Sequence, residues 1–364
     1  MPPAPRVSVI IPAWNAESTL GETLASVSAQ TIADIEIFVV DDGSTDGTAA
    51  IAQYSARDDR RIRLIRRANA GVAAARNAGL FQARAAHAAW LDADDLWHPT
   101  KLERQLRLVD AAAAPLAFVY TGYRMIDARG RIQPLPRTVA DLSGHSFLRQ
   151  IATTQFTNVS TLLAPTEPAR ALGGHDPSLR AAGLEGAEDL LLQLRLAAHG
   201  PAGFVPEALV GYRMHGANMS RAVARAARSN RLALDKVRAG HGDVPGWVWR
   251  MGQGRMAGFA LQMLATGRPV EAFRYLSALA ARAPRETIAT LARSLPFLIR
   301  DRLGLRPPDP ELGRRFLEAD PATLPIEGHM LLSRKAEDRL RAADRKRAEG
   351  QPRRATRSRP EAVA

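Results

Sequence analysis

The chain of 364 residues is 46% hydrophobic and 24% charged, which is enough for one large domain or two ordinary domains with a buried core. It contains no cysteine, which excludes a disulfide framework and a thiolate metal site, and no run of 18 or more apolar residues, so we expect no transmembrane helix. The formal net charge of +13 is spread along the sequence and suits phosphate-bearing or membrane-surface partners.

The first residues lead directly into a strand. Residues 1–6 lack the apolar region of a signal peptide, so we expect a cytoplasmic protein and leave open a peripheral contact with the inner face of the membrane. Val7–Ile11 reads as a buried strand, and Pro12 is expected to end it because proline cannot donate to a central ladder. Ala13–Glu17 is then a loop, and Ser18 suits the N-cap of a helix.

Strands and helices alternate four times in the first ninety residues. Glu36–Val40 and Arg63–Ile65 read as the next strands, a helix is expected over Val72–Ala86, and a fourth strand begins near Ala89. This alternation predicts an α/β fold with an open, mostly parallel sheet flanked by helices. No Gly-x-Gly-x-x-Gly follows the first strand, which argues against a dinucleotide-binding fold of the Rossmann type.

The stretch Ala89–Asp95 ends an apolar run in three carboxylates within four positions. Ligands of open α/β sheets bind just beyond the carboxyl ends of the strands, and carboxylates gathered there repel one another unless a cation lies among them. Mg²⁺ takes one or two carboxylates together with substrate phosphates. We therefore interpret the stretch as a metal site that holds a diphosphate, with a solvated acidic turn or a helix N-cap as the structural alternative.

A second acidic pair precedes a leucine-rich helix further along the chain. After an expected helix over Pro99–Asp110 and strands at Phe118–Tyr120 and Asn158–Leu163, the pair Glu188-Asp189 opens the run Leu190–Leu196. An acid in the first turn of a helix is stabilised by the helix dipole by about 0.3–1 kcal/mol. That stabilisation is the structural explanation of Asp189, and a functional role is the alternative.

The remainder of the chain carries fewer functional signals. Helices are expected over Met251–Thr266 and Val270–Ala283, and Ser294–Ile299 could lie on a membrane surface or in the core. From Ser333 to the last residue there are 11 Lys and Arg against 5 Asp and Glu, without apolar periodicity. We expect a weak helix there followed by disorder, with no contribution to the core.

Four sequence motifs resemble the family 2 inverting glycosyltransferases of the GT-A fold. The motifs occur in the family's order over about ninety residues, at 7–15, 39–48, 71–79 and 91–95. A fifth similarity, Glu188-Asp189 before the leucine-rich run, resembles the signature in which the Asp is the catalytic base. The closing Tyr212-Arg213-x-His215 resembles the family's last strand. The resemblance implies a GT-A-type catalytic domain at residues 1–221, a helical region at 222–305, and a linker with a basic, partly disordered tail at 306–364.

The resemblance also implies an activity and roles for individual residues. The expected enzyme is a metal-dependent hexosyltransferase that moves a sugar from a nucleotide-diphosphate donor, expected to be a UDP-sugar, to a hydroxyl of a glycan, a lipid-linked glycan or another cell-envelope acceptor. Asp189 is the expected catalytic base, and Asp94, Asp92 and His215 are the expected ligands of Mg²⁺ or Mn²⁺, with Asp95 in support. The residues expected to bind the nucleotide are Pro12, Trp14, Asn15, Glu17, Asp42, Gly71, Arg76 and Asp92.

Some of these assignments leave an alternative open. Arg76 could contact phosphate or pair with an aspartate, and His215 could be structural. Other classes of protein also remain: a nucleotidyltransferase on a similar fold would need a basic, Gly-rich loop after the first strand, and residues 12–17 contain no Lys or Arg. A nucleic-acid-binding protein could use the basic tail, but no usual binding module appears, so nucleic acid is not an expected partner. A non-catalytic scaffold would not require the carboxylates that are present.

Overall fold

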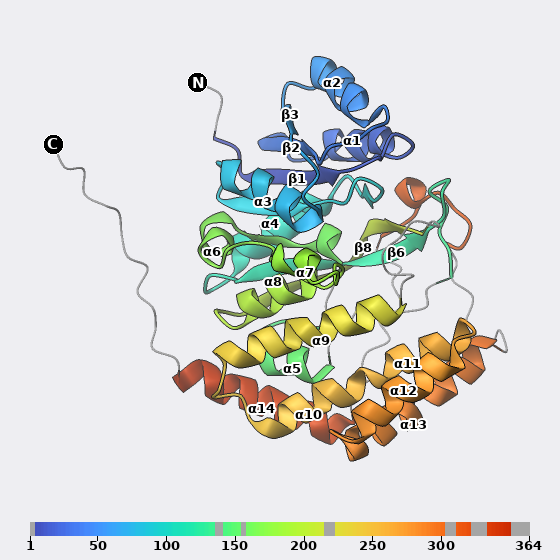
Figure 1. Cartoon of the computed structure of the whole chain (residues 1–364). Coiled ribbons are helices and arrows are strands. Elements are labelled where there is room, and N and C mark those ends of the chain that lie inside the picture. Colours follow the sequence, from blue (N-terminus) through green and yellow to red (C-terminus); the bar gives the residue numbers. More distant parts are fainter. Residues whose placement is uncertain are drawn as a thin grey trace.

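The structure, a computed structural model, describes residues 4–134, 141–153, 158–214, 223–302, 311–321 and 333–350, with the backbone alone over 296–302. An eight-stranded sheet crosses the molecule in the order β3-β2-β1-β4-β7-β6-β8-β5 (Figure 1). The strands are β1 (Val7–Ala13), β2 (Ile35–Asp41), β3 (Ile62–Arg66), β4 (His87–Trp90), β5 (Leu96–Trp97), β6 (Phe118–Ile126), β7 (Leu163–Pro165) and β8 (Ala202–Arg213). The first four strands pair in parallel, β7 and β5 pair antiparallel with their neighbours, and β6 pairs in parallel with β8. The predicted mostly parallel α/β sheet is confirmed.

Helices cover both faces of the sheet, and the alternation of side chains along the strands explains why. Val9 and Ile11 of β1 pack in one cluster with residues of α1 (Leu20–Ser28) and α4 (Lys101–Ala111). Ile10, between them, faces the opposite side, where Gly79 of α3 (Val72–Gln82) lies against it. The other helices of this part are α2 (Thr48–Asp58), α5 (Phe147–Thr153), α6 (Thr166–Ala171), α7 (Ser178–Ala181), α8 (Glu188–Ala197) and the short 3-10 helix η1 (Val159–Thr161).

Pro12 lies inside β1, and the prediction that it ends the strand was wrong. The carbonyl of Ile10 accepts from Leu91 after β4, whereas the carbonyl of Ala13 accepts from Asp42 after β2. The backbone groups of position 12 therefore point toward β4, as those of Ile10 do. The pairing with β4 ends at Trp90, so no ladder hydrogen bond is lost at the proline.

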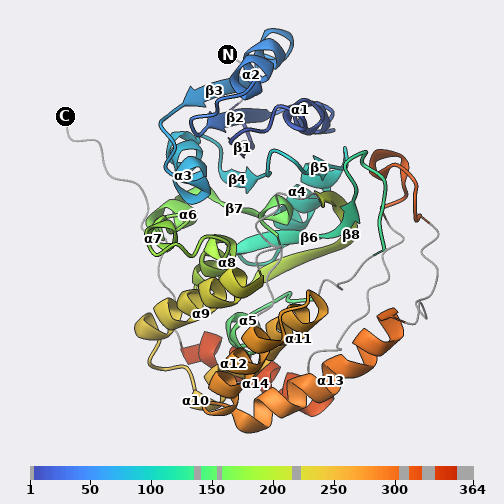
Figure 2. The same ribbon diagram turned by 45° about the vertical axis from the view of Figure 1, so that its right-hand side comes forward.

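The C-terminal helices pack beneath the sheet layer (Figure 2). They are α9 (Val223–Gly240), α10 (Gly246–Arg255), α11 (Ala257–Ala265), α12 (Pro269–Ala280), α13 (Pro284–Arg302) and α14 (Arg334–Gly350). The 3-10 helix η3 (Phe316–Glu318) lies instead beside β5 and β6, where Phe316 packs with Leu96 and Ile126. The helix expected over Met251–Thr266 is divided at Met256 between α10 and α11. Within the described helices, none combines the length and hydropathy that crossing a bilayer requires.

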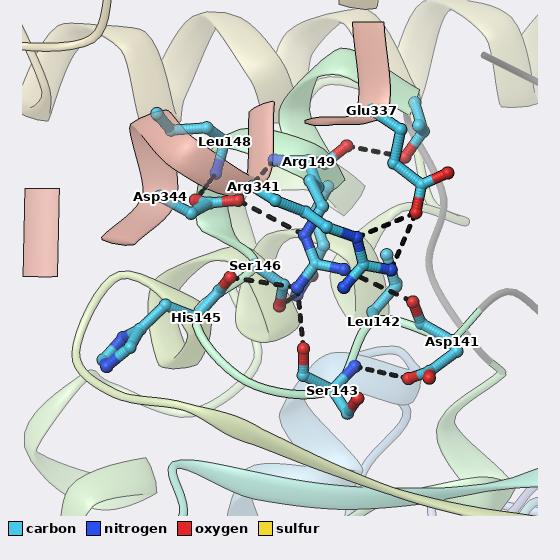
Figure 3. Close-up of polar contacts among 12 residues, drawn as sticks. Asp141, Leu142, Ser143, His145, Ser146, Leu148, Arg149, Glu337, Arg341 and Asp344 are labelled. Atoms are coloured by element: carbon cyan, nitrogen blue, oxygen red, sulfur yellow. Dashed lines mark hydrogen bonds and ion pairs between the residues drawn. The ribbon is translucent and has the colours of Figure 1, made fainter. Parts of the chain in front are cut away.

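Helix α14 contradicts the expectation that the tail contributes nothing to the core. Leu340 is fully buried in the same hydrophobic cluster as Ile10, Trp90 and Leu190. The helix docks on α5 through Asp344, whose Oδ1 accepts from the Leu148 N–H at 2.7 Å (Figure 3). Leu340 and Asp344 are the buried residues of α14, and a helix with a single buried leucine shows no apolar periodicity in the sequence.

A buried ion pair completes the docking of α14. The side chains of Arg149 and Asp344 are 5% and 1% exposed, with Nε and Oδ2 3.4 Å apart. The Arg149 guanidinium also donates to the carbonyls of Ser143 at 2.7 Å and His145 at 3.0 Å (Figure 3). Burial raises the pKa of Asp344 to about 6, against the hydrogen bonds from Leu148 and the charge of Arg149 that lower it. One carboxylate thus holds both the start of α5 and the arginine that orders the preceding loop.

The docking of α14 predicts a large loss of stability for Asp344→Ala. The substitution leaves Arg149 without its carboxylate in a buried site, which costs about 3 kcal/mol of unfolding free energy. Urea denaturation measures the loss. Asp338→Ala, at an exposed position of the same helix, is the matched control and should leave stability unchanged. Equal stability of the two variants would show that the docking contact contributes little.

Candidate active site

The loops after β1, β2 and β4 meet at the carboxyl edge of the parallel strands, as the sequence predicted. The Asn15 side chain accepts from the Thr45 N–H at 2.9 Å, and the Glu17 carboxylate accepts from the Gly47 N–H at 3.0 Å. Both side chains therefore tie the first loop to the second. Trp14, 59% exposed, projects from the same loop and leaves a broad aromatic surface in solvent.

Asp42 is almost fully buried, and its carboxylate organises the backbone that leads into α3. It accepts from the Gly71 N–H at 2.7 Å and the Ala70 N–H at 3.1 Å, and it lies 3.1 Å from Nε of Arg67. Gly71 has φ +91°, and a Cβ there would come within 2.6 Å of Arg180. The glycine is thus required by both backbone conformation and space.

Arg76 of α3 lies at the centre of the site and joins two of the predicted functional carboxylates. Its guanidinium donates to Asp92 Oδ1 at 2.7 Å through Nη2 and to Asp189 Oδ1 at 2.6 Å through Nη1. The Arg76 side chain is 3% exposed, whereas those of Asp92 and Asp189 are 30% and 21% exposed. Of the two roles considered for Arg76, the structure has the aspartate partner.

The electrostatics of these three groups follow from burial and from one another. Burial alone would lower the pKa of Arg76, but Asp189 and Asp92 raise it above its ordinary value. Burial would raise the pKa of Asp189, but the charge of Arg76 and a contact with His175 hold it below the usual range. The pKa of Asp92 is raised by burial and by repulsion from Asp189 and Asp94, against the opposing effect of Arg76. Asp189 is therefore ionised at neutral pH.

Asp95 has a structural role beside this group. Its Oδ2 accepts from the Ser160 hydroxyl at 2.6 Å, and its Oδ1 accepts from the Arg213 N–H at 2.9 Å. The carboxylate is fully buried, and burial together with Asp94 and Asp92 raises its pKa well above the usual range. The Arg213 guanidinium donates in turn to the Asp94 carbonyl at 2.7 Å and to Glu22 at 2.7 Å. Asp95 and Arg213 thereby fix the backbone that carries Asp92 and Asp94.

The residues around Asp92 and Asp94 fit a divalent cation that is shared with a diphosphate. Among the residues that the structure describes, no group of three or more His, Cys, Asp or Glu side chains is placed to hold a metal ion by itself. Mg²⁺ bound with substrate phosphates needs only one or two carboxylates. The raised pKa of Asp92 marks negative charge that a cation there would relieve. His215, the third expected ligand, lies outside the described residues.

Sequence reasoning gave no role to several residues of the site. Glu188 is buried beside Asp189, and burial and that neighbouring charge raise its pKa to about 7. Ser160 of η1 and Arg213 at the end of β8 contact the carboxylate loop, and His175 contacts Asp189. In the sequence, His175 lies in the stretch Gly-Gly-His-Asp at 173–176, and Arg213 lies in Tyr-Arg-x-His at 212–215. These two stretches were the signals that could have identified both residues. Ser160 carried no signal of its own.

Comparison with known sequences finds a match over the part of the chain that holds these loops. Residues 8–159 match Glycosyl transferase family 2. The putative teichuronic acid biosynthesis glycosyltransferase TuaG of Bacillus subtilis is 40% identical over 127 residues, which are 35% of this chain and 50% of that protein. An uncharacterized glycosyltransferase of Rickettsia felis is 38% identical over 126 residues, 35% of this chain and 20% of that protein. The chain thus matches half or less of the length of these relatives.

Comparison with solved structures extends the likeness in fold to most of the chain. S. aureus TarS 1-349 aligns with a TM-score of 0.57 at 19% identity over 82% of this chain and 87% of that one. TarS 1-349 has also been solved in complex with UDP-GlcNAc. The mannosyltransferase PcManGT from Pyrobaculum calidifontis, in complex with GDP-Man and Mn²⁺, aligns with a TM-score of 0.54 at 21% identity over 84% of this chain and 85% of that one. At these identities the likeness concerns the fold alone.

Because Arg76 pairs with both Asp92 and Asp189, we predict that Arg76→Met loses stability to an extent that depends on pH. Without the guanidinium of Arg76, Asp92 and Asp189 have lost the positive charge between them, and their folded-state pKa values rise above the unfolded value of about 3.9. The folded state then binds more protons than the unfolded state, so the variant loses stability as pH rises through the raised pKa values. Urea unfolding should show a deficit of about 3–5 kcal/mol near pH ~8 and a smaller one near pH ~5.

Arg107→Met is the matched control for this experiment. Arg107 is 65% exposed and pairs with Glu103 on the surface of α4, so its loss should change stability little at either pH. A deficit of Arg76→Met that does not depend on pH would contradict the electrostatic role of Arg76.

Proposed function

Since residues 8–159 are a family 2 glycosyltransferase domain, we propose that the chain transfers a sugar from a nucleotide-diphosphate donor to an acceptor hydroxyl with inversion at the anomeric carbon. The observation that carries this proposal is the Arg76 bridge, with Asp92 at 2.7 Å and Asp189 at 2.6 Å. One guanidinium holds the base beside the loop expected to bind the diphosphate. An in-line displacement requires the leaving group and the base on opposite sides of the sugar, and we assign Asp92 to the first side and Asp189 to the second.

Asp189 is the proposed general base. Its lowered pKa keeps it ionised at neutral pH, and 21% of its side chain remains exposed for an incoming hydroxyl. The hydroxyl loses its proton to the carboxylate while its oxygen forms the new bond to the anomeric carbon and the bond to the diphosphate breaks. A positioned base typically contributes about 10²–10⁴ in rate. Because a single displacement occurs, the configuration at the anomeric carbon inverts.

Asp94 and Asp92 are the proposed carboxylate ligands of Mg²⁺ or Mn²⁺, with His215 as the third candidate. A bound divalent cation stabilises the charge that develops on the leaving diphosphate. The Mn²⁺ in the PcManGT structure supports the choice of metal. This chain's own contribution is the rigid loop, since Asp95 holds its backbone through Ser160 and Arg213.

A UDP-sugar is the proposed donor. Trp14 offers its exposed ring for stacking on the base, with Pro12, Asn15 and Glu17 shaping the loop beneath it. The Asp42 carboxylate accepts three hydrogen bonds from the Ala70 and Gly71 N–H groups and forms an ion pair with Arg67, which leaves about one of its roughly four lone-pair sites for the N3–H of uracil. UDP-GlcNAc in TarS and the teichuronic acid role in the name of TuaG support a UDP-sugar and a cell-envelope glycan or lipid-linked acceptor.

We further propose a peripheral contact with an anionic membrane surface through α12 and α13. Val270 and Phe273 on α12 are 62% and 72% exposed, and Ile288 and Leu295 on α13 are 66% and 52% exposed. Residues 246–295 contain seven arginines and two acidic residues. Apolar side chains among arginines are typical of helices that lie in the interface of anionic bilayers. A second copy of the same surface would instead be repelled by its like charge.

The Asp189→Asn variant tests the proposed activity. Asparagine keeps the size of the side chain and its value at a helix start, but it removes the basicity. Transfer to an acceptor should fall by about 10²–10⁴, with donor affinity within a few-fold of wild type. The melting temperature should also fall, because buried Arg76 loses one of its two charge partners and keeps Asp92. Calorimetric titration with UDP and Mn²⁺, an acceptor assay and thermal melting measure the three quantities. Normal transfer by the variant would refute the catalytic role of Asp189.

The membrane proposal predicts that Phe273→Ser with Ile288→Ser weakens binding to vesicles of anionic phosphatidylglycerol. Removing two apolar side chains from the interface should lower the affinity about tenfold or more. Co-sedimentation with vesicles measures it, and neutral phosphatidylcholine vesicles should bind wild type weakly. Tyr54→Ser, at a 66% exposed position of α2, is the control and should bind as wild type does. Equal binding by all three proteins would contradict the proposal.

A further inference from the structure

His175 is a buried histidine beside the proposed base, and the fold holds its backbone firmly. Its N–H donates to Asn77 Oδ1 at 2.8 Å, and its carbonyl accepts from Asn77 Nδ2 at 2.7 Å. Gly174 precedes it with φ +63°, and a Cβ there would come within 2.3 Å of Asn77 Oδ1. Only glycine permits this close approach of the loop to α3, so Gly174 and Asn77 together fix the position of His175.

The His175 ring has an aromatic neighbour on one side and the base on the other. The Trp90 ring, at the end of β4, meets it edge-on at a centroid distance of 5.3 Å and an interplanar angle of 74°. Nε2 lies 3.5 Å from Asp189 Oδ1, and the side chain is fully buried. Within the described part of the chain, neither ring nitrogen makes a well-formed hydrogen bond. Buried polar atoms are rarely left in this state, so a role in the site is the natural explanation.

We propose that His175 is a positioning residue for Asp189, an inference that rests on the proposed glycosyl transfer. Nε2–H of the neutral imidazole approaches Asp189 Oδ1, the same oxygen that accepts from Arg76 at 2.6 Å. The two donors hold Oδ1, and Oδ2 is the oxygen assigned to take the proton of the acceptor hydroxyl. A contact of 3.5 Å is long for a hydrogen bond, but catalytic hydrogen bonds of ligand-free sites are often long and shorten when substrates bind.

The charges around the ring keep it neutral. Burial lowers the pKa of His175 to about 4, and the positive charges of Arg76 and Arg195 lower it further. The contact with Asp189 acts in the opposite direction, since it favours the protonated ring. At neutral pH the imidazole therefore has a single N–H to offer. The contact in turn helps to lower the pKa of Asp189, so loss of the imidazole should raise that pKa.

The experiment compares three substitutions of His175 in the full chain. His175→Phe keeps a ring against Trp90 and removes both nitrogens. His175→Gln brings an amide N–H to the place of Nε2, whereas the shorter amide of His175→Asn reaches only the place of Nδ1. Transfer kcat, donor affinity by calorimetry, melting temperature and the pH profile of kcat are measured for each.

We expect His175→Phe to lower kcat about tenfold to a hundredfold, as misplacement of a catalytic group does, with donor affinity nearly unchanged. The acid limb of its kcat profile should move to higher pH, because the pKa of Asp189 rises. His175→Gln should restore most of the rate and His175→Asn should not. Unchanged kcat and acid limb in His175→Phe, or equal rates of the Gln and Asn variants, would overturn the proposal.

The comparison with Asp189→Asn separates this inference from the proposed function. If Asp189→Asn abolishes transfer and His175→Phe does not affect it, only the role of His175 fails. If neither variant affects transfer, the proposed role of Asp189 fails as well. If His175→Phe unfolds, the transfer kcat values of His175→Gln and His175→Asn still test the role of His175. Both side chains are polar, and they differ in whether the amide reaches the place of Nε2.

Discussion

The arrangement of Asp92 and Asp189 depends on one buried guanidinium, that of Arg76. Arg76 lies between Asp92 and Asp189, which come from distant parts of the sequence and repel each other. A guanidinium suits this position because its planar fork presents N–H donors in two directions and remains charged when buried. Lysine has a single ammonium and loses its charge more readily in such surroundings. The arginine thus sets the distance between the two carboxylates.

A second constraint acts on the backbone beneath those carboxylates. Asp95 contacts Ser160 and the Arg213 N–H, so the loop after β4 is attached to η1 and to the end of β8. The Arg213 guanidinium then continues the connection to Glu22 on α1. These contacts link the end of β4 to the end of β8, although β7 and β6 lie between these two strands in the sheet. Rigid support of this kind suits the proposed role of the loop, which is to hold a diphosphate in one orientation.

The sequence predicted the features that depend on local patterns, and it failed where distant contacts decide. The strands at Val7–Ala13 and Ile35–Asp41 follow from apolar runs, and the helix with Asp189 in its first turn follows from leucine spacing. By contrast, the contacts of Asp95 with Ser160 and Arg213 could not be predicted, because these partners lie 65 and 118 residues away. The place of Leu340 in the core could not be predicted either, since a basic helix with one buried leucine has no periodic signal.

The contact between Asp344 and the start of α5 also sets an order of events during synthesis. The Leu148 N–H and its acceptor are 196 residues apart in the chain. At ~5–20 residues per second, a ribosome needs about 10–40 s to make the intervening segment. Throughout that interval the first turn of α5 and the guanidinium of Arg149 lack their carboxylate partner. The nascent sheet domain therefore waits in an incomplete form, with part of its interior open, until the helix that closes it has emerged.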